Sequence, residues 1–279
     1  MIITEVKSYD LDNYNCDILL IPTCFSQISN LSFTIEEIKN IKNRNIALKI
    51  DKIIDEFELD ALEDFIKSTL NMDIQYYVFT DMSVYNILNK YNITNKGMYF
   101  SKTINCSRAD IREYNMLGLK CLVSTELPLE DIRNISNLKN NIFYSYGYSN
   151  MFYSKRKLID LYKQYSDNDF ESLNKMFMLE EETRKNERYP ILQNNNGTFI
   201  FTSFIHVLFK EIDSIDKDNF FYIDSTFIEE NDLFNILDIY KQGFSKGFSE
   251  ELYSMLLKIN SNVSGGFLYI KPSILKEEN

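Results

Sequence analysis

The sequence is poor in the residues on which many catalytic and metal sites depend. It contains one histidine, His206, so neither a Ser/His/Asp arrangement nor a two-histidine metal site can be drawn from more than one candidate. His206 lies in the apolar stretch FTSFIHVLFKEI, where a histidine is either a packed core residue or part of a site. Both interpretations stay open, and the sequence assigns no catalytic residue and no metal site.

Cysteine and glycine are also scarce. The four cysteines, Cys16, Cys24, Cys106 and Cys121, match no CxxC spacing, and most lie in or beside apolar runs. This placement predicts buried, reduced thiols that act as small apolar residues. The eight glycines form no P-loop or GxGxxG motif, so the sequence does not indicate nucleotide binding.

Long apolar runs and a basic charge balance are absent. The stretch Asp17–Pro22 is far too short to span a bilayer, and the first ten residues lack the layout of a signal peptide, so we expect a cytoplasmic protein without a membrane partner. The 30 Lys and Arg are outnumbered by 41 Asp and Glu, which gives a net charge of -11. Such a surface repels nucleic acid, so any RNA contact must be local or supplied by a partner.

Short apolar, β-branched or aromatic runs recur along the chain, and segments with helical spacing of apolar residues separate several of them. The runs predicted as strands are Met1–Val6, Cys16–Ile21, Ile46–Ile50, Ile74–Phe79, Gly97–Phe100, Lys120–Val123, Ile142–Tyr146, Thr198–Phe201 and Phe220–Ile223. This alternation favours parallel strands in an α/β fold, and some eight units favour a closed (β/α)8 TIM-like barrel, regular or irregular, over an open sheet. We therefore predict a single barrel domain over residues 1–279.

One stretch breaks this alternation. Residues 153–189 are long, charged and mostly helical in pattern, which predicts a helical excursion after the strand near 142–146. Active sites of such barrels lie at the carboxyl ends of the strands, so this excursion is where a site is expected. It begins with the triplet Lys155, Arg156 and Lys157, which could hold a carboxylate or phosphate, or could be a solvated helix start.

The triplet belongs to a longer string that resembles a known family. YGYSNMFYSKRKLIDLY (Tyr146–Tyr162) is similar to the central motif of U32 family proteins, the collagenase-like peptidases. LVSTELPLEDI (Leu122–Ile132), RYPILQNNNGTFIFTS (Arg188–Ser203), FFYIDSTF (Phe220–Phe227) and SGGFLYIKPSIL (Ser264–Leu275) resemble further segments of that family in the same order. The chain is most similar to short members that are linked to 5-hydroxyuridine formation at the tRNA wobble position.

The departures from the family pattern concern its iron–sulfur cluster. Many U32 proteins hold this cluster with four cysteines, and here the corresponding positions carry Asn150, Lys157 and a residue at or beside His206, with no evident third equivalent. The histidine before the motif glycine is Tyr146. The resemblance therefore implies no iron–sulfur cluster and no other cofactor in this chain.

The residues that the resemblance retains suit anion or substrate binding better than redox chemistry. With His206 added as a second-line candidate, the predicted substrate- or anion-binding residues are Glu126, Gly147, Ser154, Lys155, Arg156, Tyr189, Gly197, Thr198 and His206. The ligand implied is a small carboxylate.

The resemblance leaves three functions open. The first is a subunit or accessory protein of tRNA uridine 5-hydroxylation that works with a larger U32 paralogue. The second is a peptidase, although Ser154 and Lys155 are adjacent in the sequence and adjacent helical residues point in different directions. The third is a degenerate, non-catalytic partner of such a paralogue.

Overall fold

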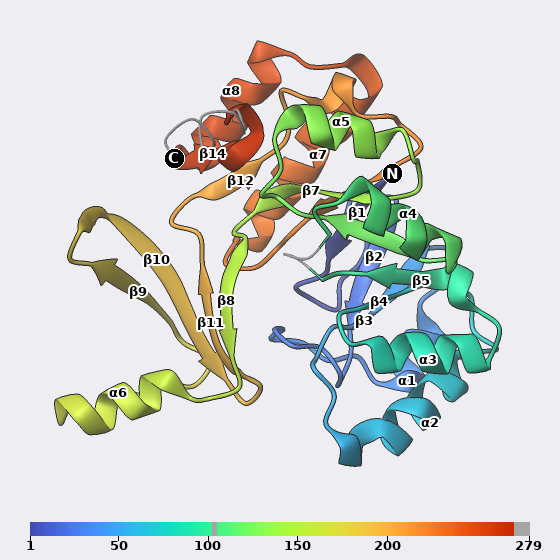
Figure 1. Ribbon diagram of the computed structural model, residues 1–279, viewed down its shortest axis with the longest axis horizontal. Helices are drawn as coiled ribbons and strands as arrows, with labels where there is room; N and C mark the ends of the chain where they lie inside the picture. The colour runs from blue at the N-terminus through green and yellow to red at the C-terminus, as the bar shows by residue number, and fades with distance from the viewer. Residues whose placement is uncertain (102–104, 271–279) are drawn as a thin grey trace.

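Eight parallel strands close into a barrel in the computed structural model, which describes residues 1–101 and 105–270 (Figure 1). The last strand pairs in parallel with both the first and the seventh, with Phe221 opposite Ile2 and Phe220 opposite Ile142, so the sheet has no free edge between them. The barrel strands are β1 (Ile2–Glu5), β2 (Ile18–Pro22), β3 (Ile46–Ile50), β4 (Ile74–Phe79), β5 (Gly97–Tyr99), β6 (Lys120–Val123), β7 (Ile142–Gly147) and β13 (Phe220–Ile223). The predicted (β/α)8 TIM-like barrel is confirmed.

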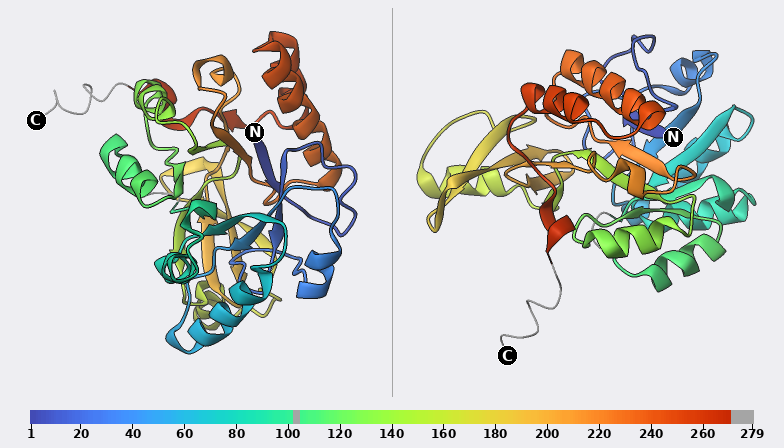
Figure 2. Two further views of the ribbon diagram at one scale, coloured as in Figure 1. Left: turned by 90° about the vertical axis from the view of Figure 1, so that its right-hand side faces the viewer. Right: turned by 90° about the horizontal axis from the view of Figure 1, so that it is seen from above.

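Helices follow the strands and cover the outside of the barrel (Figure 2). They are α1 (Ile35–Asn40), α2 (Leu59–Thr69), α3 (Met82–Lys90), α4 (Arg108–Met116), α5 (Leu129–Ser136), α7 (Glu230–Lys246) and α8 (Glu250–Ile259), with short 3-10 turns at Glu56–Glu58, Thr94–Lys96, Ile212–Ser214 and Gly266–Tyr269. Local sequence explains several boundaries. The Asp81 carboxylate, for example, caps α3 by accepting from the Ser83 N–H at 2.9 Å.

The strands are buried on both faces, because helices pack outside and side chains fill the interior. On β2, Leu19 and Ile21 pack toward the helices, whereas Ile18 and Leu20 point inward. The interior cluster is Ile3, Ile18, Leu20, Ala47, Val78, Met98, Phe100, Leu122, Ile142, Tyr144, Phe220 and Tyr222. The barrel interior is therefore a packed core and not a channel.

An excursion leaves the barrel after β7, as the sequence predicted, and projects to one side (Figure 1). It contains the helix α6 (Leu158–Ser166) and an antiparallel sheet in the order β8-β11-β10-β9. The strands are β8 (Asn150–Ser154), β9 (Met176–Glu181), β10 (Arg184–Asn194) and β11 (Gly197–Phe201). The chain returns along β12 (Ile205–Val207), which pairs antiparallel with β7 and parallel with β14 (Val263–Ser264).

The expectation that residues 153–189 are mostly helical is wrong, because only α6 is helical and the charged stretch after it forms the β9–β10 hairpin. β9 turns back at Glu182 and Thr183, and Met178 then lies opposite Pro190. The local pattern of MFMLEEETRKNER is compatible with either state. Its outcome is decided by backbone pairing with β10, which a local pattern does not contain.

Other expectations have mixed outcomes. Cys121 is buried and Cys16 is half-buried, but Cys24 and Cys106 are exposed, so the prediction of buried thiols fails for those two. The end of the closing family segment, from residue 271 onward, lies outside the described residues. No helix within residues 1–101 and 105–270 is long and apolar enough to cross a membrane.

Candidate functional site

Four charged residues are buried together at the carboxyl ends of the barrel strands. Glu5 ends β1, Lys49 lies on β3, Asp51 follows β3 and Asp224 follows β13; none is more than 5% exposed. Parallel strands bring their carboxyl ends to one edge of the barrel, which is why residues so far apart in sequence meet there. Buried charges are costly unless they are paired, so this cluster, which we call the barrel-mouth cluster, is the main candidate site.

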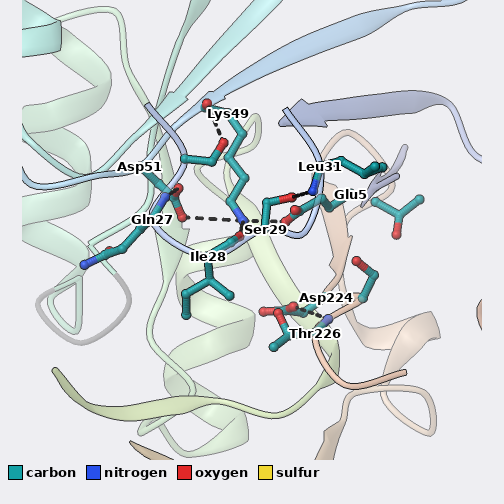
Figure 3. A network of polar contacts seen from close by, with 12 residues as sticks. Glu5, Gln27, Ile28, Ser29, Leu31, Lys49, Asp51, Asp224 and Thr226 are labelled. Atoms are coloured by element: carbon teal, nitrogen blue, oxygen red, sulfur yellow. Dashed lines mark hydrogen bonds and ion pairs between the residues drawn. The ribbon is translucent and has the colours of Figure 1, made fainter. Parts of the chain in front are cut away.

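Lys49 is the centre of the cluster (Figure 3). Its ammonium pairs with the Glu5 carboxylate, donates to the Ile28 carbonyl at 2.7 Å and lies 3.8 Å from Oδ2 of Asp51. Burial alone would favour the neutral amine, but the nearby carboxylates of Asp51 and Glu5 outweigh it and hold the pKa of Lys49 above its ordinary value. Lys49 is therefore charged at neutral pH, with hydrogen bonds to Glu5 and Ile28 and its charge also close to Asp51.

The two aspartates are oriented by backbone donors. Asp51 Oδ1 accepts from the N–H of Gln27 at 2.8 Å, and Asp224 Oδ1 accepts from the N–H of Thr226 at 2.9 Å. The other oxygen of Asp224 lies 3.1 Å from the hydroxyl of Tyr144, which donates to it. Burial and the charge of Asp224 raise the pKa of Tyr144 well above its ordinary value, so Tyr144 keeps its proton.

A cavity of about 200 Å³ opens directly onto this cluster. Lys49, Asp51 and Asp224 lie on its wall. Phe100 and Tyr222 come from the barrel, whereas Phe152, Tyr153 and Phe199 come from the inserted sheet; these five aromatic side chains also line the cavity. The excursion thus covers part of the barrel mouth and leaves a partly open cavity, which we call the mouth cavity.

The loop after β2 is the third wall, and the excursion holds it in place. Nδ2 atoms of Asn194 and Asn196 each donate to the Gln27 carbonyl at 2.8 Å. These asparagines flank the turn between β10 and β11, where Asn-Gly is a strong hairpin signal. The same turn that folds the inserted sheet therefore positions Gln27, whose N–H orients Asp51.

A second cavity of about 170 Å³ lies on the Glu5 side of the cluster and shares Ile28 and Thr226 with the first. It contains Lys7, whose ammonium donates to the Ser225 carbonyl at 3.1 Å. Burial lowers the pKa of Lys7 despite the acidic residues around it.

Among the predicted residues, Glu126 and His206 line a third, smaller cavity of about 90 Å³, together with Tyr144. His206 lies on β12 with its ring 5.9 Å from that of Tyr144, centroid to centroid. Burial lowers the pKa of His206 to about 4, which a hydrogen bond with the backbone of Tyr144 only partly opposes. His206 is therefore neutral at physiological pH. It is buried, as expected of a packed core residue, and it also lines a cavity, as expected of a site residue.

Five predicted residues meet at the base of the excursion. Thr198 Oγ1 donates to the Arg156 carbonyl at 2.8 Å and accepts from the Leu158 N–H at 2.9 Å, so it fixes the start of α6. At Gly197 the backbone has φ +136°, and a Cβ there would lie 2.1 Å from the Ser154 carbonyl oxygen. Lys155 and Arg156 are exposed, and the Lys155 ammonium pairs with Asp55. The contacts of Ser154, Gly197 and Thr198 thus fix the end of β8, the start of α6 and the start of β11 relative to one another.

The remaining two lie apart from these five. Gly147 ends β7 with φ +135°, and a Cβ there would lie 2.7 Å from Cβ of Asp224 and 2.8 Å from the Tyr144 hydroxyl. It therefore leaves room for the mouth cluster. Tyr189 lies on β10, where its hydroxyl donates to Glu187. The structure thus divides the predicted residues among the excursion base, the His206 cavity, the barrel mouth and the β9–β10 hairpin.

The mouth cluster itself was missed from the sequence, although a signal for it exists. Glu5, Asp51 and Asp224 each come at or just after the end of an apolar strand run, in IITE, IALKID and FFYID. A charged residue at the carboxyl end of a predicted barrel strand marks a site more directly than a charge triplet on an excursion.

Residues 25–277 match the sequence model of Peptidase family U32. The chain belongs to this family. The match covers six of the eight barrel strands and the entire excursion, so the residues that line the mouth cavity of this U32 protein lie within the family's shared region, whereas Glu5 and Lys7 precede it. Neither the comparison with curated proteins nor that with solved structures gave a match.

The iron–sulfur cluster of many U32 proteins does not fit the residues present here. Its positions carry Asn150, Lys157 and a residue at or beside His206, and the third position has no evident equivalent. In the part of the chain that the structure describes, no three His, Cys, Asp or Glu side chains gather closely enough to hold a metal ion. The residues at these positions therefore do not support iron–sulfur chemistry in this chain.

Proposed function

We propose that this U32 protein is a subunit of a tRNA uridine 5-hydroxylation system and that its barrel mouth is a ligand-binding site. The observation that carries the ligand site is the mouth cavity, where buried charges and aromatic side chains from two separate sheets line one space. Concave cavities with a few convergent polar groups are typical of small-molecule sites. The tRNA role rests on the resemblance of Tyr146–Tyr162 to the short members of the family.

A larger U32 paralogue is part of this proposal. The net charge of -11 disfavours tRNA binding by this chain alone, so a partner would supply the contact with RNA. Half of the large apolar residues that are exposed in the described chain lie in the excursion, between Met151 and Leu179. Exposed apolar surface of this kind often marks a protein interface, which supports a partner on this side.

The small carboxylate ligand predicted from the sequence stays a proposal tied to the excursion. Arg156 is exposed and could contact an anion that the partner presents. Lys155 is less suited, because its ammonium already pairs with Asp55. The mouth cavity and Arg156 are thus two separate points at which the proposal can be tested.

A peptidase mechanism has less support from the described residues. Ser154 Oγ accepts from the Arg156 N–H at 3.1 Å, and Lys155 is directed to Asp55, so the two do not act as a Ser-Lys pair. A peptidase would need a nucleophile elsewhere in the chain.

Mass spectrometry of tRNA nucleosides tests the proposed function. We expect deletion of the gene to abolish 5-hydroxyuridine and its derivatives, and re-expression of the wild-type chain to restore them. Asp224→Asn and Arg156→Ala should each fail to restore them. Asp218→Asn, at an exposed carboxylate paired with Lys139, is the matched control and should restore them fully. An unchanged nucleoside profile after deletion would reject the tRNA role.

A further inference from the structure

The mouth cavity has an excess of acceptors. Three of the four buried charged residues of the cluster are acidic, and the fourth, Lys49, donates to Glu5 and the Ile28 carbonyl and lies 3.8 Å from Asp51. Lys49 is therefore already paired with carboxylates of the protein. Asp51 and Asp224 each accept from one backbone N–H, Asp224 also accepts from the Tyr144 hydroxyl, and both retain further lone pairs.

A further cation, Lys7, lies beside the cluster but not in the mouth cavity. Lys7 lines the other cavity and donates to the Ser225 carbonyl. Its charge interacts with Glu229 and Glu230 outside the cluster and with Glu5 and Asp224 within it. The wall of the mouth cavity thus carries the two carboxylates of Asp51 and Asp224 and one cation, Lys49, which is already paired with Glu5.

Aromatic side chains form a large part of the rest of the wall, beside polar and aliphatic residues. Tyr222 packs edge-on against Phe100 with ring centroids 5.1 Å apart, and Tyr153 stacks on Phe199 at the same centroid distance. Aromatic faces attract cations, and the attraction grows when water is excluded. Apolar cavities of about 150 Å³ hold a benzene molecule, so the 200 Å³ here leaves room for a small organic ligand.

We infer that the mouth cavity binds a small organic cation, with a primary ammonium group between Asp51 and Asp224 and an apolar or aromatic body against Tyr222, Phe100 and Phe199. The inference rests on the barrel mouth as ligand site in the proposed function, and not on the tRNA role. A metal ion suits the cavity less well, because no three potential ligands of the described chain gather at metal-binding distance. The ammonium would replace water as the donor to both aspartates.

Three probes of similar shape and different charge test this inference on the full chain: benzylammonium, benzyl alcohol and benzoate. Titration followed by ligand-observed NMR should show saturable binding of benzylammonium, weaker binding of benzyl alcohol and none of benzoate. Asp224→Asn and, separately, Asp51→Asn should weaken benzylammonium binding at least about tenfold, since each removes a charged hydrogen-bond acceptor. Circular dichroism identifies a variant that fails to fold, and the other aspartate variant then decides the result.

Asp218→Asn is again the control and should bind benzylammonium like the wild type. The inference is overturned if benzoate binds as tightly as benzylammonium, if folded wild-type protein binds none of the probes, or if Asp218→Asn weakens binding as much as Asp224→Asn. The two proposals fail separately. Binding of benzylammonium with unchanged tRNA nucleosides would reject the tRNA role alone, whereas loss of 5-hydroxyuridine on deletion without such binding would reject the cation alone.

Discussion

The barrel and the excursion differ in their sheet edges: the barrel sheet is closed, whereas the inserted sheet is open. The barrel closes on itself through β13, so each of its strands has two neighbours and its apolar side chains are buried on both faces. The inserted sheet is open, with β8 and β9 as edge strands, and it exposes Met151, Phe152, Met176 and Met178. An open sheet edge with exposed apolar residues tends to pair with another chain unless it is covered. We therefore expect the excursion to contribute to a protein interface and the barrel to contribute most of the stability.

Charges follow the same division. At the barrel mouth, Glu5, Lys49 and Asp51 are buried together, whereas in the excursion the Arg188–Glu180 pair at 2.8 Å is exposed, as is Lys155. Buried charges depend strongly on each partner, while exposed pairs contribute little. The difference predicts that equivalent substitutions in the two regions have very different effects.

The largest expected effect is that of Lys49→Met. This change removes the cation of the mouth cluster and leaves the buried carboxylates of Glu5 and Asp51 without their cationic partner. Breaking a buried ion pair in this way costs about 3–5 kcal/mol of unfolding free energy. Urea denaturation followed by circular dichroism measures it.

The matched control is Lys155→Met, which removes the same side chain from an exposed pair with Asp55 and should leave the urea midpoint unchanged. A second check is Glu5→Gln in the Lys49→Met background, which removes one of the unpaired charges and should recover part of the loss. If Lys49→Met and Lys155→Met unfold at the same urea concentration, the buried pairs of the mouth cluster stabilise the fold no more than an exposed pair does.

Methionine allows the same comparison for apolar packing. Met98 on β5 is 0% exposed inside the barrel, and Met178 on β9 is 49% exposed. Met98→Ala leaves a cavity in a packed core and should cost about 2–5 kcal/mol, whereas Met178→Ala should stay within about 0.5 kcal/mol. Thermal or urea unfolding of both variants measures the difference. A large loss in Met178→Ala would mean that its side chain is covered, for example by a second copy of the chain.

The barrel could be predicted from sequence because its strands are encoded locally. All nine predicted strand runs are strands, and eight of them form the barrel, because each run is short and apolar and helical patterns separate several of them. The ninth, Thr198–Phe201, belongs to the inserted sheet. β9 was missed because its strand state depends on pairing with β10 across a turn, and its own residues are ambiguous.

The site was predicted less well, for a related reason. Lys155 and Arg156 are conspicuous in sequence because they are adjacent, but adjacency on the chain does not bring side chains into one cavity. Glu5, Lys49 and Asp224 are far apart in sequence and meet only when the barrel closes. Gly147 and His206 were singled out and do lie beside the mouth cluster or the smaller cavity next to Tyr144.

The smallest expected effect is that of protonating His206, at the junction of barrel and excursion. It does not change the folding stability at neutral pH and appears only in acid. Its pKa is lowered from 6.5 to about 4 by burial, so the unfolded chain takes up a proton more readily than the folded chain between these values. The stabilising contribution is complete above pH 6.5 and falls progressively as the pH drops toward 4. At its limit the loss is about 3 kcal/mol, since one pKa unit corresponds to about 1.4 kcal/mol.

His206→Gln isolates this effect, because the chain has no other histidine. Urea unfolding of both proteins at a series of pH values from 7 to 4.5 should give a stability difference that shrinks or reverses as the pH falls, since the glutamine variant has no site to protonate. The acidic residues of the mouth cluster and Glu126 are present in both proteins, so their contribution cancels in this difference. A stability difference that stays constant over the whole range would mean that the pKa of His206 is not lowered. Water would then reach His206 on β12 more easily in solution than its burial indicates.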